Sequence, residues 1–97
     1  MTLPVPARAT LASVNRVSAS VTAVTLAAAN TFRMGLYLFN DSTSEAYVKY
    51  GAAASTTSYT IKMSAGSYYE MPAPINTLLI SCVWTTATGA MQVTEAS

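Results

Sequence analysis

Short runs of strand-forming residues, separated by turn residues, cover most of this chain. Apolar and polar positions alternate over 14–20, which predicts a first strand, and the run 21–26 predicts a second. The run 36–39 consists of four large apolar residues, turn residues follow at 40–44, and positions 46–50 alternate again. These two runs predict a central antiparallel hairpin, in which the first strand is covered on both faces.

The second half of the chain continues this pattern. A loop of small residues at 51–58 leads to a strand at 59–63, in which Tyr59, Ile61 and Met63 are expected to face the core. Further strands are expected at 68–71, 78–84 and 91–95, the last with Met91 and Val93 inward. A tight turn at 87–89 joins the final two strands as another hairpin. We therefore predict an all-β fold, a single small β-sandwich or barrel of about eight short antiparallel strands.

The first residues of the chain lack this alternation. Pro4 and Pro6 lie within residues 1–13, where no clear period is present. Because proline fixes φ and carries no N–H, we expect an extended N-terminal arm at 1–13, followed by the β-sandwich domain at 14–97. Such an arm is either frayed or laid across a neighbouring molecule.

The composition indicates that part of the apolar surface is covered by other chains. Of 97 residues, 52% are hydrophobic and only 9% are charged, against about 25% charged in a typical domain. A domain of this size buries only about two-thirds of its unfolded surface. A single cysteine rules out an internal disulfide as reinforcement. A homo-oligomer is therefore expected.

The charge distribution excludes several classes of partner. The net charge is +1 and there is no basic run, so no binding to nucleic acid is expected. No apolar run approaches the roughly 20 residues of a membrane span, and the N-terminus lacks the order of a signal peptide. We expect a soluble protein made in the cytoplasm.

The side chains offer little catalytic chemistry. Without histidine, a Ser-His-Asp triad and a Cys-His pair are excluded. Asp41 and Glu45 lie close enough in sequence to share a calcium ion, but an Asx-turn and a solvated glutamate explain them as well. Glu70 and Glu95 do not complete a recognisable acid pair, and Cys82 lies in an apolar run, as a buried inert thiol does. We expect no catalytic, metal or cofactor site and no enzyme activity.

The candidate binding residues are aromatic side chains and arginines. Tyrosine and tryptophan are enriched at protein interfaces, and aromatic platforms on β-sandwiches bind sugars. Arginine anchors carboxylates across an interface, although a solvated arginine with a packed stem is the alternative. The candidate interface residues are Pro4, Pro6, Arg8, Arg16, Arg33, Tyr50, Tyr68 and Trp84.

The chain also resembles a known group of proteins through a series of short segments. The segments are 17–18, 25–30, Arg33, 36–42, 46–51, 58–60, 65–66, 68–72, Trp84, 87–89 and 93–95. In this order the chain resembles small β-domain structural proteins of bacteriophage virions, of the decoration (cement) or head-fibre type.

The resemblance implies a non-enzymatic component of the virion, made in the host cytoplasm. The expected role is capsid decoration, in which an oligomer binds the major capsid protein or other virion proteins. A homotrimer is the expected state because three-fold positions on a capsid offer matched sites. Two alternatives are a glycan-binding head or tail attachment module and a structural tail or portal-adjacent component.

Overall fold

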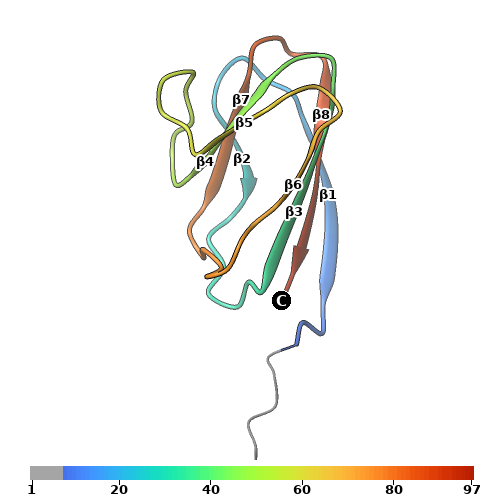
Figure 1. Cartoon of the computed structure of the whole chain (residues 1–97), viewed down its shortest axis with the longest axis vertical. Coiled ribbons are helices and arrows are strands. Elements are labelled where there is room, and N and C mark those ends of the chain that lie inside the picture. Colours follow the sequence, from blue (N-terminus) through green and yellow to red (C-terminus); the bar gives the residue numbers. More distant parts are fainter. Residues whose placement is uncertain (1–7) are drawn as a thin grey trace, which may run out of the picture.

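The computed structural model describes residues 8–97, which form a β-sandwich (Figure 1). The strands are β1 (Ala12–Ser18), β2 (Val24–Ala27), β3 (Gly35–Ser42), β4 (Ala46–Tyr50), β5 (Ile61–Met63), β6 (Tyr68–Glu70), β7 (Ile80–Trp84) and β8 (Gly89–Ala96). The first sheet has the order β1-β8-β3-β6 and the second has the order β2-β7-β4-β5. All strand pairs are antiparallel. The predicted all-β fold is confirmed, as a sandwich.

Residues 8–97 contain no helix, and therefore none long and apolar enough to cross a membrane. Of the arm expected at 1–13, the structure describes only the last residues. There the N–H groups of Thr10 and Leu11 each donate to the carbonyl of Ser97, at 2.8 Å. Pro4 and Pro6 lie outside the described residues.

The predicted central hairpin is wrong, although both of its strands exist. β3 pairs with β8 and β6 in the first sheet, whereas β4 pairs with β7 and β5 in the second. The turn after β3 thus carries the chain from one layer to the other. The predicted last hairpin is wrong for the same reason, because β7 and β8 also lie in different sheets. Turn residues show that a chain reverses, but they do not show which sheet the next strand joins.

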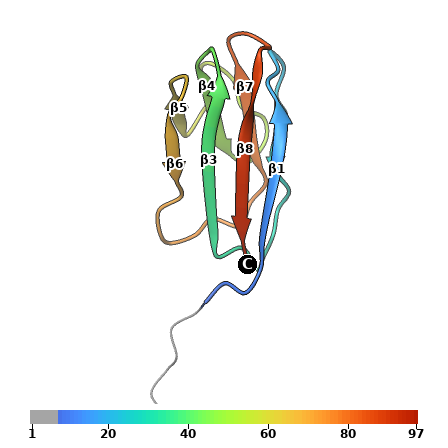
Figure 2. The same ribbon diagram turned by 90° about the vertical axis from the view of Figure 1, so that its right-hand side faces the viewer.

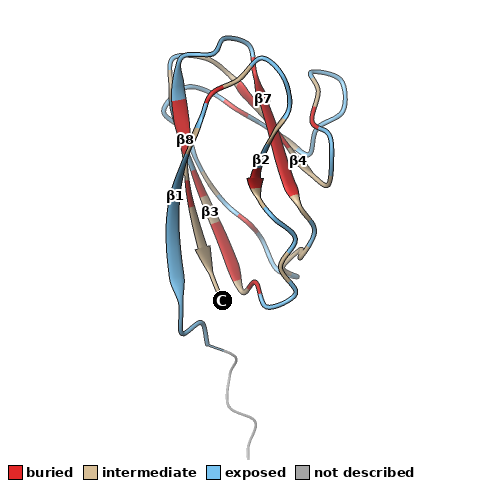
Figure 3. Cartoon of the chain, turned by 180° about the vertical axis from the view of Figure 1, so that it is seen from behind, coloured by how far each residue is buried: buried red, intermediate tan, exposed pale blue. Residues whose placement is uncertain are grey.

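β3 is covered on one face only, so the prediction of two covered faces is wrong. Leu36 and Leu38 are buried in the core, whereas Phe39 is 41% exposed. β7, in contrast, is buried along its whole length (Figure 3). It lies between β2 and β4 in the second sheet, as a central strand does.

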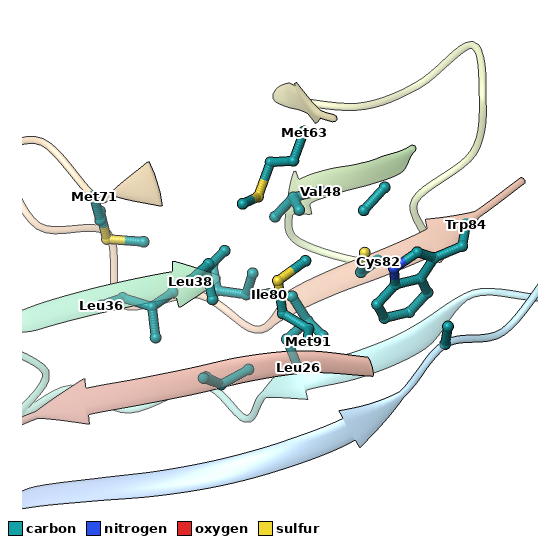
Figure 4. Close-up of a cluster of buried hydrophobic side chains, with 13 residues drawn as sticks. Leu26, Leu36, Leu38, Val48, Met63, Met71, Ile80, Cys82, Trp84 and Met91 are labelled. Carbon is teal, nitrogen blue, oxygen red and sulfur yellow. The ribbon is translucent and has the colours of Figure 1, made fainter. Parts of the chain in front are cut away.

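The core lies between the two sheets and consists of aliphatic, methionine and tryptophan side chains (Figure 4). The inward positions predicted for Met63, Met91 and Val93 are confirmed by their burial. Tyr59 was expected to face the core, but it precedes β5 and is 43% exposed. Its ring packs edge-on against Tyr47, with 5.0 Å between centroids. The expectation for Tyr59 is therefore wrong.

One buried amide ties three segments together at the end of the sandwich where β3 ends. The Asn40 Nδ2 group donates to the carbonyls of Ser44, Met63 and Ser64, at 3.0 to 3.1 Å. Its Oδ1 atom accepts a hydrogen bond from Trp84 Nε1 at 3.2 Å. Because these groups are satisfied, a fully buried asparagine is compatible with the core.

Candidate interaction surface

The outer face of the first sheet presents exposed aromatic side chains. Along β3, Tyr37 and Phe39 alternate with buried leucines and therefore point away from the core. The register pairs Phe39 with Tyr68 of β6, so these two rings are cross-strand neighbours. Tyr68 is 61% exposed. Figure 2 shows this sheet face-on, with β6, β3, β8 and β1 side by side.

Polar side chains flank the aromatic ones. The register places Glu70 beside Tyr37 on β6, and it places Thr94 and Gln92 beside Tyr37 and Phe39 on β8. We call this surface the aromatic face. It consists of Tyr37, Phe39, Tyr68, Glu70, Gln92 and Thr94.

Tyr37 lies along the sheet because Gly35 leaves room for it. A Cβ atom at Gly35 would lie 2.8 Å from the Tyr37 hydroxyl oxygen and 3.1 Å from ring carbons. The phenol ring therefore extends back over the glycine, two residues earlier on the same strand face. The result is a flat surface rather than a projecting side chain.

The charges on this side of the sheet are few. Arg16 Nη1 and Asp41 Oδ2 form an ion pair at 2.7 Å, with both side chains about half exposed. Within residues 8–97, Glu70 forms no ion pair. Partial desolvation, with smaller contributions from Glu70 and Tyr37, raises the pKa of Tyr68. The face offers flat aromatic contact and a few hydrogen-bonding groups, which suits binding.

Arg33 is not available for an interface, which corrects the prediction for this residue. Its side chain is fully buried, and Nε donates to Glu95 Oε2 at 2.7 Å. The remaining guanidinium nitrogens donate to the carbonyls of Ala28, Asn76 and Leu78, each at 2.8 Å. Arg33 anchors a carboxylate as expected, but that carboxylate belongs to its own chain.

Trp84 is only 1% exposed, so its prediction as an interface or sugar-binding residue is wrong. Tyr50 is partly buried, and its hydroxyl shares a short hydrogen bond with the Tyr69 hydroxyl. This contact links β4 of the second sheet to β6 of the first. Burial, followed by the contact with Tyr69, raises the pKa of Tyr50. Tyr50 therefore holds the two sheets together.

The remaining candidates lie at the surface. Arg8 and Arg16 are exposed, as is Tyr68. Tyr68 is the predicted aromatic residue that lies on the aromatic face. The sequence-based assignment missed Tyr37 and Phe39, which it placed in a strand covered on both faces. Their alternation with leucine was the available signal, because neighbouring strand residues point to opposite faces.

A hydroxyl-rich hollow lies at one end of the sandwich. It has a volume of about 640 Å³ and is open to solvent, and its lining residues are Thr43, Ser44, Glu45, Ser64, Ala65, Thr85 and Thr86. The Glu45 carboxylate is 3.2 Å from Lys62 Nζ. Within residues 8–97, no three potential metal ligands gather here or elsewhere. Glu45 pairs with Lys62 and Asp41 pairs with Arg16, so each of the two carboxylates considered for a calcium ion has a basic side chain as its partner.

Comparison with known proteins identifies no relative. The chain matches no protein-family model, no curated protein and no solved structure. The fold and the aromatic face thus stand on the residues described above, and the resemblance to phage structural proteins stays a prediction.

Proposed function

We propose that this chain is a non-enzymatic structural protein of a phage virion, which binds another virion protein through its aromatic face. The observation that carries the proposal is that Phe39 and Tyr68 are exposed side by side on one sheet, with the half-buried Tyr37 next to Phe39. A contiguous exposed aromatic surface is typical of a protein-binding site. The sequence resemblance supports a virion location, with the major capsid protein as the partner.

Capsid decoration suits such a surface. A flat contact made by a few side chains gives modest affinity on its own, but many copies on a particle, or several copies in one oligomer, multiply weak contacts. Because Glu70 is the one charged residue of the aromatic face, attachment by this face depends more on buried apolar area than on salt concentration.

A glycan is the second candidate ligand. Aromatic rings stack on the apolar faces of sugars, and Glu70, Gln92 and Thr94 supply hydrogen-bonding groups beside the rings. A glycan array with the wild type and the Tyr68→Ser variant tests this candidate. Binding of a defined glycan that the variant loses would replace the protein-binding proposal.

The virion proposal is tested on particles of the phage that encodes the chain. Particles are purified by density gradient, and the chain and the major capsid protein are quantified by mass spectrometry. We expect the chain at a fixed and high ratio to the major capsid protein. Absence of the chain from purified particles would contradict the proposal.

A further inference from the structure

The first sheet has one long free edge. β1 (Ala12–Ser18) pairs with β8 on one side, and no described strand pairs with its other side (Figure 2). The other edge strands are short, with four residues in β2 and three each in β5 and β6. β1 has seven residues and is exposed along almost all of them. A long exposed edge is a template for pairing with another strand.

The hydrogen-bond pattern identifies which residues present free backbone groups. Leu11 and Ser97 exchange two hydrogen bonds, and beyond the other end of β1 the Ala19 N–H donates to Gly89 O at 2.9 Å. Between Leu11 and Ala19 the register of β1 with β8 is unbroken. In an antiparallel ladder, residue pairs that exchange backbone hydrogen bonds alternate with pairs that do not. The residues with backbone groups facing away from β8 are therefore Ala12, Val14, Arg16 and Ser18.

The usual features that protect an edge are missing from β1. The strand contains no proline or lysine. Its one charge, on Arg16, is neutralised by Asp41 at 2.7 Å. The apolar side chain of Val14 is 62% exposed. Along β1 itself, an approaching strand would therefore meet no proline ring and no uncompensated charge.

We propose that this edge binds β1 of a second copy of the chain, antiparallel, about a two-fold axis at Asn15. In that register all seven residues of β1 pair. Val14 lies opposite Arg16 of the second copy, and Ala12 lies opposite Ser18. The even-numbered residues of β1, whose backbone groups face the free edge, thus each gain a hydrogen-bonded partner. Val14 is covered by the aliphatic stem of the arginine opposite it.

Other self-pairing registers are poorer. A two-fold axis at Arg16 leaves Ala12 and Ser13 without partners inside β1. An axis at Val14 leaves Val17 and Ser18 without partners inside β1. The Asn15 register also pairs the two Asn15 residues in an unbonded position, where side chains approach closely.

The dimer joins the two first sheets into one sheet. Val14 and Arg16 pair with Thr94 and Gln92, so they lie on the same side as the aromatic face, and the two aromatic faces share one side of the joined sheet. A two-fold dimer differs from the trimer expected from the sequence. It does not depend on the virion proposal, since it is measured on the purified chain alone.

The first test is the solution mass of the full chain, measured by light scattering over a concentration series. We expect the mass to rise to twice the 10.2 kDa of one chain. The Val14→Pro variant removes an N–H that faces the free edge and no bond to β8, so it should fold but stay monomeric. Val14→Thr keeps the N–H and should still dimerise. A monomeric or trimeric wild type, or a Val14→Pro variant that dimerises equally, would overturn the proposal.

The second test fixes the register by disulfide cross-linking. Asn15→Cys places two thiols opposite each other across the two-fold axis, so mild oxidation should give a covalent dimer on a denaturing gel. Ser13→Cys is the control, because its two copies are about 13 Å apart in this register. The native Cys82 is buried. Absence of the Asn15→Cys dimer, or equal cross-linking of both variants, would overturn the register.

Discussion

Two ion pairs of equal length show how burial decides the role of a residue. Arg33 and Glu95 lie 2.7 Å apart, as do Arg16 and Asp41. The Arg33 side chain is fully buried, whereas that of Arg16 is 54% exposed. The Arg33 guanidinium also satisfies three carbonyl groups in the segments before β3 and β7. The buried pair therefore holds one end of the sandwich together.

We predict that Arg33→Met lowers the free energy of unfolding by about 3 to 5 kcal/mol. It leaves three carbonyls without a donor, and it leaves the part-buried Glu95 carboxylate with only the Asn30 Nδ2 group as donor. Arg16→Met is the matched control, and its exposed pair contributes about 0 to 1 kcal/mol. Urea denaturation followed by tryptophan fluorescence measures both. Equal losses would show that burial does not separate the two pairs.

The buried thiol of Cys82 should be unreactive in the folded chain. Burial raises the pKa of its thiol from 9.0 to about 12. The thiolate is the reactive form, so native Cys82 should resist alkylation at pH 8 and react once the chain is unfolded. The Ser13→Cys variant provides an exposed thiol as control. Rapid alkylation of Cys82 in the native wild type would contradict its burial.

The same shift has a consequence for stability at high pH. Between pH 9.0 and about 12 the unfolded chain has released the Cys82 proton while the folded chain retains it. The folded state then binds more protons than the unfolded state does. The free energy of unfolding therefore falls as pH rises through that range. A Cys82→Ala variant should show a smaller loss of stability over the same range.

At the scale of elements, the crossing between sheets depends on glycine at the start of β8. Gly89 has φ of +88°, and a Cβ atom there would lie 2.5 Å from Asp41 O and 2.6 Å from Ser42 Cα. Gly66 has a similar φ of +77°, with nothing within 4 Å of its Cβ position. A side chain at Gly66 would therefore meet backbone strain alone, whereas a side chain at Gly89 would meet both backbone strain and a steric clash.

We predict that Gly66→Ala costs about 1 to 2 kcal/mol, the penalty for a left-handed residue. Gly89→Ala should cost clearly more, since β3 and β8 must also move apart. Thermal unfolding of both variants measures the difference. Equal melting temperatures would show that the end of β3 yields to the added methyl group without cost.

The sequence was sufficient to predict strands but not their partners. Alternation located β4 and β5, and an unbroken apolar run located β7. The sheet assignment failed for β3 and β4, because a short polar turn suits both a hairpin and a crossing between layers. The same limit applied to Arg33 and Trp84, whose burial depends on segments distant in sequence.

At the scale of the whole molecule, the apolar composition is divided between a core and a surface. The core takes Leu26, Leu36 and Leu38, the methionines of β5 and β8 and Trp84, while the aromatic face and the edge of β1 remain exposed. The sequence predicted an excess of apolar surface, but it could not place that excess. Only the pairing of β3 with β6 brings Phe39 and Tyr68 together.

Binding through the aromatic face is tested by co-sedimentation of the chain with phage particles that lack it. The wild type should bind and saturate the particles, and Phe39→Ser combined with Tyr68→Ser should weaken binding at least about tenfold, the effect of losing roughly 1.4 kcal/mol. Tyr59→Ser, an exposed tyrosine beside Tyr47 of the second sheet, is the control and should bind as the wild type does. Unchanged binding by the folded double variant would contradict the assignment of the aromatic face.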